Sequence, residues 1–155
     1  MISIFTQEAI KEEVKMTVSH YQTNNVYELC NRFRIEIFSN NLGKSMGLLQ
    51  YYNNQPLIHI HTNAPHKKFS IAYILGYFSF NFDPDNSVLF DGLENQEAIT
   101  FATELLLTDE MILANLNQVR KLTTGEIAKF FNLPVPAIQI KINGISDGRI
   151  LFPHF

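Results

Sequence analysis

The chain has 155 residues and a mass of 17.8 kDa, which is enough for one domain with a substantial hydrophobic core. Its formal net charge of −3 lacks the positive excess typical of nucleic-acid-binding proteins, so direct binding to nucleic acid is not expected. The single cysteine, Cys30, excludes an intramolecular disulfide and suits a reducing cytosol, and no apolar run is long enough to cross a bilayer. We therefore expect a cytoplasmic protein that does not associate with membranes.

The composition is rich in aromatic residues and poor in charge. Only 17% of the residues are charged, whereas the chain contains 13 Phe and 6 Tyr. A surface with little charge is weakly protected against association, so this composition predicts a protein-binding patch or a homo-oligomer. The alternative is that the aromatic side chains simply fill the core.

The first half of the chain combines helical and strand patterns. Thr6 is a suitable cap for a helix over Gln7–Tyr21, and Asn24 or Asn25 begins a second helix that runs through Phe33. Three strands are expected after these helices, over residues 34–39, 47–52 and 57–62. These patterns predict an α+β fold, in which a small antiparallel three-stranded sheet packs against several helices.

The stretch over residues 57–81 organises the chain because it passes from a strand directly into a helix. The sequence Asn63-Ala64-Pro65-His66 ends the strand. From Phe69 onward the apolar residues recur at three- and four-residue steps, which predicts a helix that starts near Lys68 or Ser70.

The rest of the chain is expected to be mostly helical. A loop covers residues 82–91, and a helix then runs from Glu94 or Asn95 to Leu107. Thr108 is a cap for another helix over residues 109–120.

Two further helices are expected near the C-terminus. Thr123 or Thr124 begins the first, Leu133-Pro134 ends it, and the second covers residues 135–143. The tail over residues 146–155 has an apolar end that docks on the body or meets a partner. We expect one domain, with a core over residues 1–107 and C-terminal helices and tail over residues 108–155.

The helix after the third strand carries a family resemblance. Its segment FSIAYILGYF, residues 69–78, resembles FTIAHELGHY of the ImmA/IrrE family of bacterial and phage zinc peptidases. In that family two histidines of a His-Glu-x-x-His motif bind zinc, and the glutamate acts on the zinc-bound water. Here Tyr73, Ile74 and Tyr77 stand at the positions of the first histidine, the glutamate and the second histidine. The resemblance also covers the order of elements, which implies a zincin-like core.

These three replacements predict the loss of the zinc site. A phenol has a pKa near ~10 and is a poor zinc ligand at neutral pH, and isoleucine can neither accept a proton nor orient water. We therefore expect that the chain is not an enzyme and that it needs no metal or other cofactor. The rings of Tyr73 and Tyr77 are expected to fill the former metal cavity.

A second segment, EAITFATELLLT over residues 97–108, resembles the family's EANRFAAELLMP. Glu97 stands where the family usually supplies its third zinc ligand. One carboxylate does not hold zinc usefully, because affinity depends on several converging ligands. Glu97 is therefore interpreted as a relic with Tyr73 or Tyr77 as its expected partner. The alternative is an exposed carboxylate that the helix dipole favours at a helix start.

Two other patterns offer competing functions. His59 and His61 are two residues apart on one strand, so they share a face and are weak candidates for a metal site, with solvent-facing polar positions as the alternative. The segment over residues 122–142 is similar to helix-turn-helix sequences of the EIAxxFxL type. Only Gln139 and Lys141 are plausible base readers there, and packing helices are the favoured interpretation.

Three hypotheses follow from these patterns. The first is a non-catalytic ImmA/IrrE-like protein of a prophage or mobile element. The resemblance implies that its partner is a helix-turn-helix repressor, so the chain would act as a transcription regulator or antirepressor. The second is a zinc peptidase with non-standard ligands, such as His59, His61 and Glu97, that cleaves a repressor. The third is a DNA-binding regulator that works through residues 123–143.

Overall fold

The structure is a computed structural model that describes residues 6–145, so the expected docking of the tail lies outside the described residues. It confirms the α+β class, with a mixed sheet packed against helices. The first half contains α1 (Gln7–Tyr21), α2 (Val26–Arg32), β1 (Glu36–Asn40), β2 (Gly47–Tyr52), β3 (Gln55–His61) and α3 (Lys67–Phe80). The second half contains β4 (Val88–Phe90), α4 (Gln96–Leu106), α5 (Asp109–Ala114), α6 (Leu116–Val119), α7 (Thr124–Phe131) and α8 (Val135–Gly144).

The sheet differs from the expected antiparallel three-stranded one. Its order is β1-β3-β2-β4, and β1 pairs with β3 in parallel while β2 is antiparallel to both β3 and β4. Asn53 and Asn54 form the tight turn between β2 and β3, both with positive φ, and this turn makes β3 the neighbour of β2. The chain therefore places β3 between β1 and β2. The fourth strand, β4, lies in the segment expected to be a loop.

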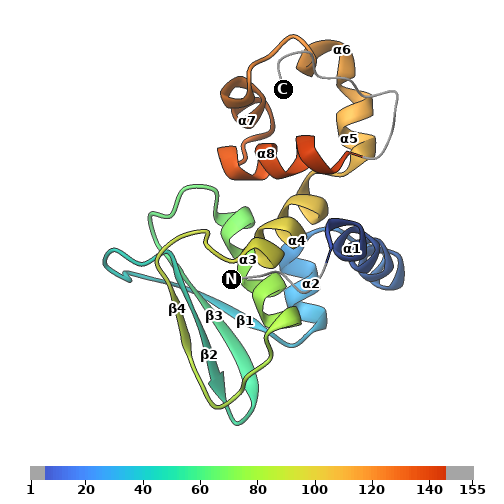
Figure 1. The fold of residues 1–155 in the computed structure, drawn as a ribbon. Coiled ribbons are helices and arrows are strands. Elements are labelled where there is room, and N and C mark those ends of the chain that lie inside the picture. The colour runs from blue at the N-terminus through green and yellow to red at the C-terminus, as the bar shows by residue number, and fades with distance from the viewer. Residues whose placement is uncertain (1–5, 146–155) are drawn as a thin grey trace.

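The helix α3 forms the centre of the fold, as Figure 1 shows, with the sheet on one side and α4 on the other. One face of the sheet is buried, through Leu49, Ile58 and Ile60. The approach of α3 to α4 is close, because a Cβ atom on Gly76 would lie only 2.9 Å from Phe101 Cβ. Glycine is therefore required at this contact.

Most helix starts follow the expected caps. The Thr6 hydroxyl accepts a hydrogen bond from Ala9 N–H at the start of α1, and the Asn25 side chain accepts from Tyr27 N–H at the start of α2. Asn95 caps α4, and Thr123 forms a capping box with Glu126 at the start of α7. These local hydrogen bonds explain why the sequence located the helices closely.

Two features differ from the sequence prediction: the start of α3, and the middle of the helix expected over residues 109–120. α3 begins at Lys67, and its N-cap residue His66 makes no side-chain capping bond. The other helix is interrupted at Asn115, where α5 ends and α6 begins. The Asn115 side chain donates to the carbonyl of Met111 at 2.9 Å, and such side-chain bonds compete with the backbone bonds that continue a helix.

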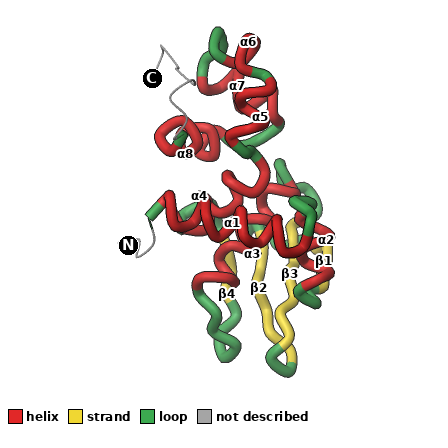
Figure 2. The backbone as a smooth tube through the Cα atoms, turned by 90° about the vertical axis from the view of Figure 1, so that its right-hand side faces the viewer, coloured by secondary structure: helices red, strands yellow, loops and turns green. Residues whose placement is uncertain are grey.

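The helices α5–α8 lie beyond α4, away from the sheet (Figure 1), and a buried ion cluster ties them to the core. Lys141 Nζ donates to Glu104 Oε1 at 2.8 Å and lies 2.5 Å from Asp109 Oδ1. Lys11 Nζ lies 3.1 Å from Asp109 Oδ2 and donates to the Gly144 carbonyl at 2.9 Å. This cluster joins α1, α4, α5 and α8. Figure 2 shows α1 running alongside α4 on the helical side of the sheet.

Among residues 6–145, no helix is both long and apolar enough to cross a membrane.

Replacing Lys141 with methionine tests the ion cluster. The variant keeps a side chain of similar length but leaves Glu104 buried with Lys11 3.9 Å away. We expect Lys141→Met to lower the free energy of unfolding by about 3 kcal/mol, as measured by urea denaturation. Lys15→Met is the control, because Lys15 pairs with Glu12 on the surface, and it should change stability by less than about 1 kcal/mol. Equal effects of the two variants would contradict the buried cluster.

The same cluster predicts how stability depends on pH. Burial alone would raise the pKa of Asp109, but hydrogen bonds from Lys141 and Lys11 outweigh it and hold the pKa below its ordinary value of 3.8. A carboxyl group with a lowered folded-state pKa stabilises the protein above pH 3.8 and loses this contribution as the pH falls through the folded-state pKa. The difference in thermal midpoint between the wild type and Asp109→Asn should therefore shrink below pH 3.8. A constant difference would refute this assignment.

Candidate functional site

Tyr73, Ile74 and Tyr77, the residues at the motif positions, lie on α3. Tyr73 contacts the backbone before α4, whereas Ile74 faces β2. The side chain of Tyr73 is 1% exposed, and its hydroxyl oxygen accepts hydrogen bonds from the backbone N–H groups of Glu94, at 3.2 Å, and Asn95, at 2.9 Å. Ile74 is fully buried and faces β2, because its Cδ1 atom lies 2.5 Å from the position that a Cβ on Gly47 would occupy. Tyr77 is half-buried.

Phe90 of β4 covers both tyrosines. Its ring centroid lies 5.6 Å from that of Tyr73 and 5.1 Å from that of Tyr77, with the rings nearly perpendicular in both pairs. A pocket of about 430 Å³ opens beside these three rings, and Leu89, Asp91 and Glu94 also line it. We call it the β4 pocket. The two phenol rings form part of the wall of this open pocket.

The phenol of Tyr73 is uncharged at neutral pH. Burial raises its pKa above the ordinary value of 10, although the hydrogen bonds from Asn95 and Glu94 lower it in part. A neutral hydroxyl that already accepts two backbone hydrogen bonds is a poor metal ligand.

Glu97 lies in the first turn of α4 and is 5% exposed, so the alternative of an exposed carboxylate is wrong. The expected hydrogen bond to Tyr73 or Tyr77 is not formed either; the Tyr73 hydroxyl instead accepts from two backbone N–H groups just before Glu97. One carboxylate oxygen of Glu97, Oε2, is buried without a hydrogen-bond partner. Two phenols, an isoleucine and one carboxylate do not make up a zinc ligand set, so the residues at these positions do not fit a zinc ion.

The two strand histidines make other contacts. His59 accepts a hydrogen bond from the Asn40 amide at 2.6 Å, donates to Gln50 at 3.0 Å and stacks on Phe38. His61 Nδ1 accepts from the Leu42 N–H at 2.9 Å. Within residues 6–145, no three His, Cys, Asp or Glu side chains gather into a metal-binding group, so His59, His61 and Glu97 are not brought together.

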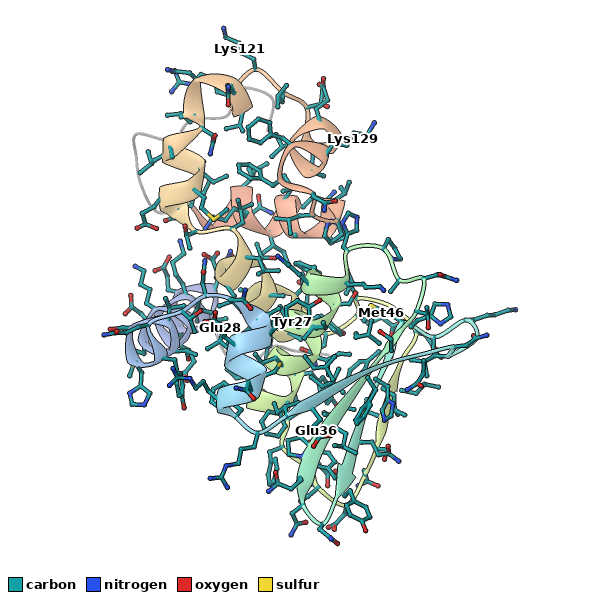
Figure 3. The ribbon with its side chains drawn as sticks, turned by 180° about the vertical axis from the view of Figure 1, so that it is seen from behind. Tyr27, Glu28, Glu36, Met46, Lys121 and Lys129 are labelled. Atoms are coloured by element: carbon teal, nitrogen blue, oxygen red, sulfur yellow. The ribbon has the colours of Figure 1, made fainter. Side chains whose placement is uncertain are left out.

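The C-terminal helices do not present the expected base readers as a pair. Gln139 is exposed, but Lys141 is 1% exposed and is bound to Glu104 and Asp109. Exposed cations of this region instead include Lys121 and Lys129, which point outward from the far end of the C-terminal helices in Figure 3. The interpretation of Lys141 as a base reader is therefore wrong, because its buried ammonium group pairs with the carboxylates of Glu104 and Asp109.

Comparison with known proteins identifies the family. Residues 30–143 match the Peptidase_M78 model, which describes the IrrE N-terminal-like domain. The chain is also 38% identical over 156 residues to Metallopeptidase ImmA of Bacillus subtilis (strain 168), and the match covers 95% of this chain and 92% of that protein. The chain belongs to the ImmA/IrrE family. This result confirms the resemblance that the segments over residues 69–78 and 97–108 indicated.

The same comparisons correct one expectation. We expected that the chain is not an enzyme, but the matched ImmA/IrrE model is that of a peptidase family and the relative is named a metallopeptidase. The expectation is therefore wrong. That expectation inferred the absence of enzyme activity from the replacement of three side chains on α3. Three positions on one helix do not exclude activity that depends on other residues of the chain.

Sequence reasoning missed two parts of this site. Phe90 was placed in a loop, because the three residues of β4 are too few to form a recognisable strand pattern. The backbone groups that hold Tyr73 were also missed, because N–H groups before a helix have no signature in the sequence. The only usable signal was Asn95, which marked the start of α4.

Replacing Tyr73 with phenylalanine tests the hydrogen bonds at this site. Tyr73→Phe leaves the Asn95 N–H buried without its acceptor and should lower the free energy of unfolding by about 1–3 kcal/mol. Tyr77→Phe is the matched control, because Tyr77 is half-buried, and it should change stability by less than about 0.5 kcal/mol. Urea denaturation measures both variants. A Tyr73→Phe variant as stable as Tyr77→Phe would show that the hydroxyl has no such role.

Proposed function

We propose that this ImmA/IrrE family member regulates a helix-turn-helix repressor by binding a segment of it at the β4 pocket. The observation that carries this proposal is the combination of an open strand edge and an acidic, aromatic pocket at β4. Family membership supports the choice of partner class, since the resemblance implies a repressor of a mobile element or prophage.

The edge of β4 is suited to a polypeptide. β4 pairs with β2 on one side, and no other strand among the described residues pairs with it on the other. Unpaired backbone groups on an edge strand accept an extended peptide through main-chain hydrogen bonds. Leu89 is 58% exposed on this strand, which gives such a peptide an apolar contact.

The charge of the β4 pocket favours a basic partner. Asp91 and Glu94 are both exposed at its rim, and among residues 6–145 no Lys or Arg lines it. The DNA-facing surface of a DNA-binding domain is basic, so its charge complements this rim. A repressor held through that surface would be kept from DNA, which is how the chain would act as an antirepressor.

The binding experiment uses the full chain and the helix-turn-helix repressor encoded beside its gene, followed by isothermal titration. We expect binding that weakens about tenfold in Leu89→Lys, because the new charge repels a basic partner and removes an exposed apolar contact. Phe38→Lys is the matched control, since Phe38 is exposed on β1 at the opposite edge of the sheet, and it should leave the affinity unchanged.

The result has two readouts. Absence of binding, or equal affinities of the two variants, would overturn the proposal. Intact-mass analysis of the same mixture measures cleavage of the repressor, which the peptidase names of the family and of the relative make the natural second measurement.

A further inference from the structure

We propose that a second pocket, at the start of α3, binds a carboxylate carried on an apolar body. The pocket has a volume of about 340 Å³, and its lining includes Met46, His61, His66, Phe69, Ser70 and Leu93. We call it the α3 pocket. Met46 lies where the sheet meets the start of α3 (Figure 3). This inference goes beyond the proposed function and does not depend on it, although Asp91 lines both pockets.

Ser70 provides the first donor. Its side chain lines the pocket and is 4% exposed, and its hydroxyl makes no hydrogen bond with any described residue. A helical serine can bond to the carbonyl four residues earlier, as Ser79 does with Leu75 at 2.9 Å on the same helix. A hydroxyl that has no described protein partner and lies on the wall of a pocket is free to donate to a ligand bound there.

The first turn of α3 provides further donors and a favourable dipole. Ser70 N–H bonds to the His66 carbonyl at 3.0 Å, so the N–H groups of Lys67, Lys68 and Phe69 precede the first intrahelical bond. This turn has no capping side chain and no acidic residue. The positive end of a 14-residue helix, flanked by two lysines, therefore favours a negative group.

His61 adds a donor of defined tautomer. Its Nδ1 accepts from the Leu42 N–H, so the neutral ring carries its proton on Nε2. His66 has the opposite arrangement, because its Nδ1 lies 3.2 Å from the Asn132 carbonyl, which only accepts. His61 and Ser70 both line the α3 pocket, and each has a donor, Nε2–H and the hydroxyl, that no described residue accepts from.

The remaining lining sets the nature of the ligand. Asp91 already accepts a hydrogen bond from the Ser45 hydroxyl at 3.0 Å, and the lining also includes the cation Lys44. The side chains of Met46, Phe69 and Leu93 make much of the wall apolar. Such walls suit a ligand with one negative charge and a hydrocarbon body, which describes a carboxylic acid or the C-terminal residue of a polypeptide.

The test titrates the full chain with isovalerate and, as the uncharged control of the same shape, isovaleramide. We expect chemical shift changes at Ser70 and His61, with the acid binding about tenfold more tightly than the amide. Equal affinities, or no change at these residues, would overturn the proposal without any variant being needed.

A pair of variants on one helix assigns the donor. Ser70→Ala should weaken isovalerate binding about tenfold, whereas Ser79→Ala, the same change outside the pocket, should leave it unchanged. Equal effects of the two variants would refute the role of Ser70.

Titration with two short apolar peptides, one with a free C-terminus and one with a C-terminal amide, distinguishes a polypeptide C-terminus from a small carboxylic acid as the ligand. Tighter binding of the free-acid peptide than of isovalerate supports a polypeptide C-terminus as the ligand. Binding of isovalerate alone supports a small acid. Both results are independent of the repressor titration, so failure of one proposal does not affect the other.

Discussion

The burial of α3 between the sheet and α4 is the constraint on which the rest of the structure depends. Gly76 of α3 allows Phe101 of α4 to approach the helix closely, and Gly47 of β2 leaves room for Ile74 on the opposite side. Both sides of the helix are therefore fixed by neighbouring atoms, and a side chain at position 74 must fit against backbone. Isoleucine satisfies that requirement through its shape, whereas a charged group there would need a partner.

The same packing gives Tyr73 a definite structural role. Its hydroxyl accepts from the backbone before α4, and its ring lies against Phe90 of β4. One side chain thus connects α3, the edge strand and the start of α4. These contacts fix the wall of the β4 pocket, and a wall that is already ordered loses little conformational entropy of its own when a peptide segment binds.

The sequence predicted those features that depend on neighbouring residues. Thr6, Asn95 and Thr123 located helix starts because each cap is a bond to a residue two or three positions away. The parallel pairing of β1 and the burial of Lys141 depend on contacts between distant segments, which no local pattern contains. The segment around the motif identified the family correctly. It did not justify the conclusion that the chain is not an enzyme, because that conclusion rested only on the absence of the two histidines and the glutamate of the motif.

The C-terminal helices are held to the core at both ends of α8. Before its start, the Asn132 carbonyl faces His66 at the first turn of α3, and near its end Lys141 is bound to Glu104 of α4. A helix anchored in this way cannot expose Lys141 to a phosphate backbone without breaking a buried ion pair, which is costly. The α7–α8 pair therefore acts as a packing unit of the core, despite its helix-turn-helix-like sequence. Because the α3 pocket lies at the first of these anchors, a ligand there would contact both parts of the chain.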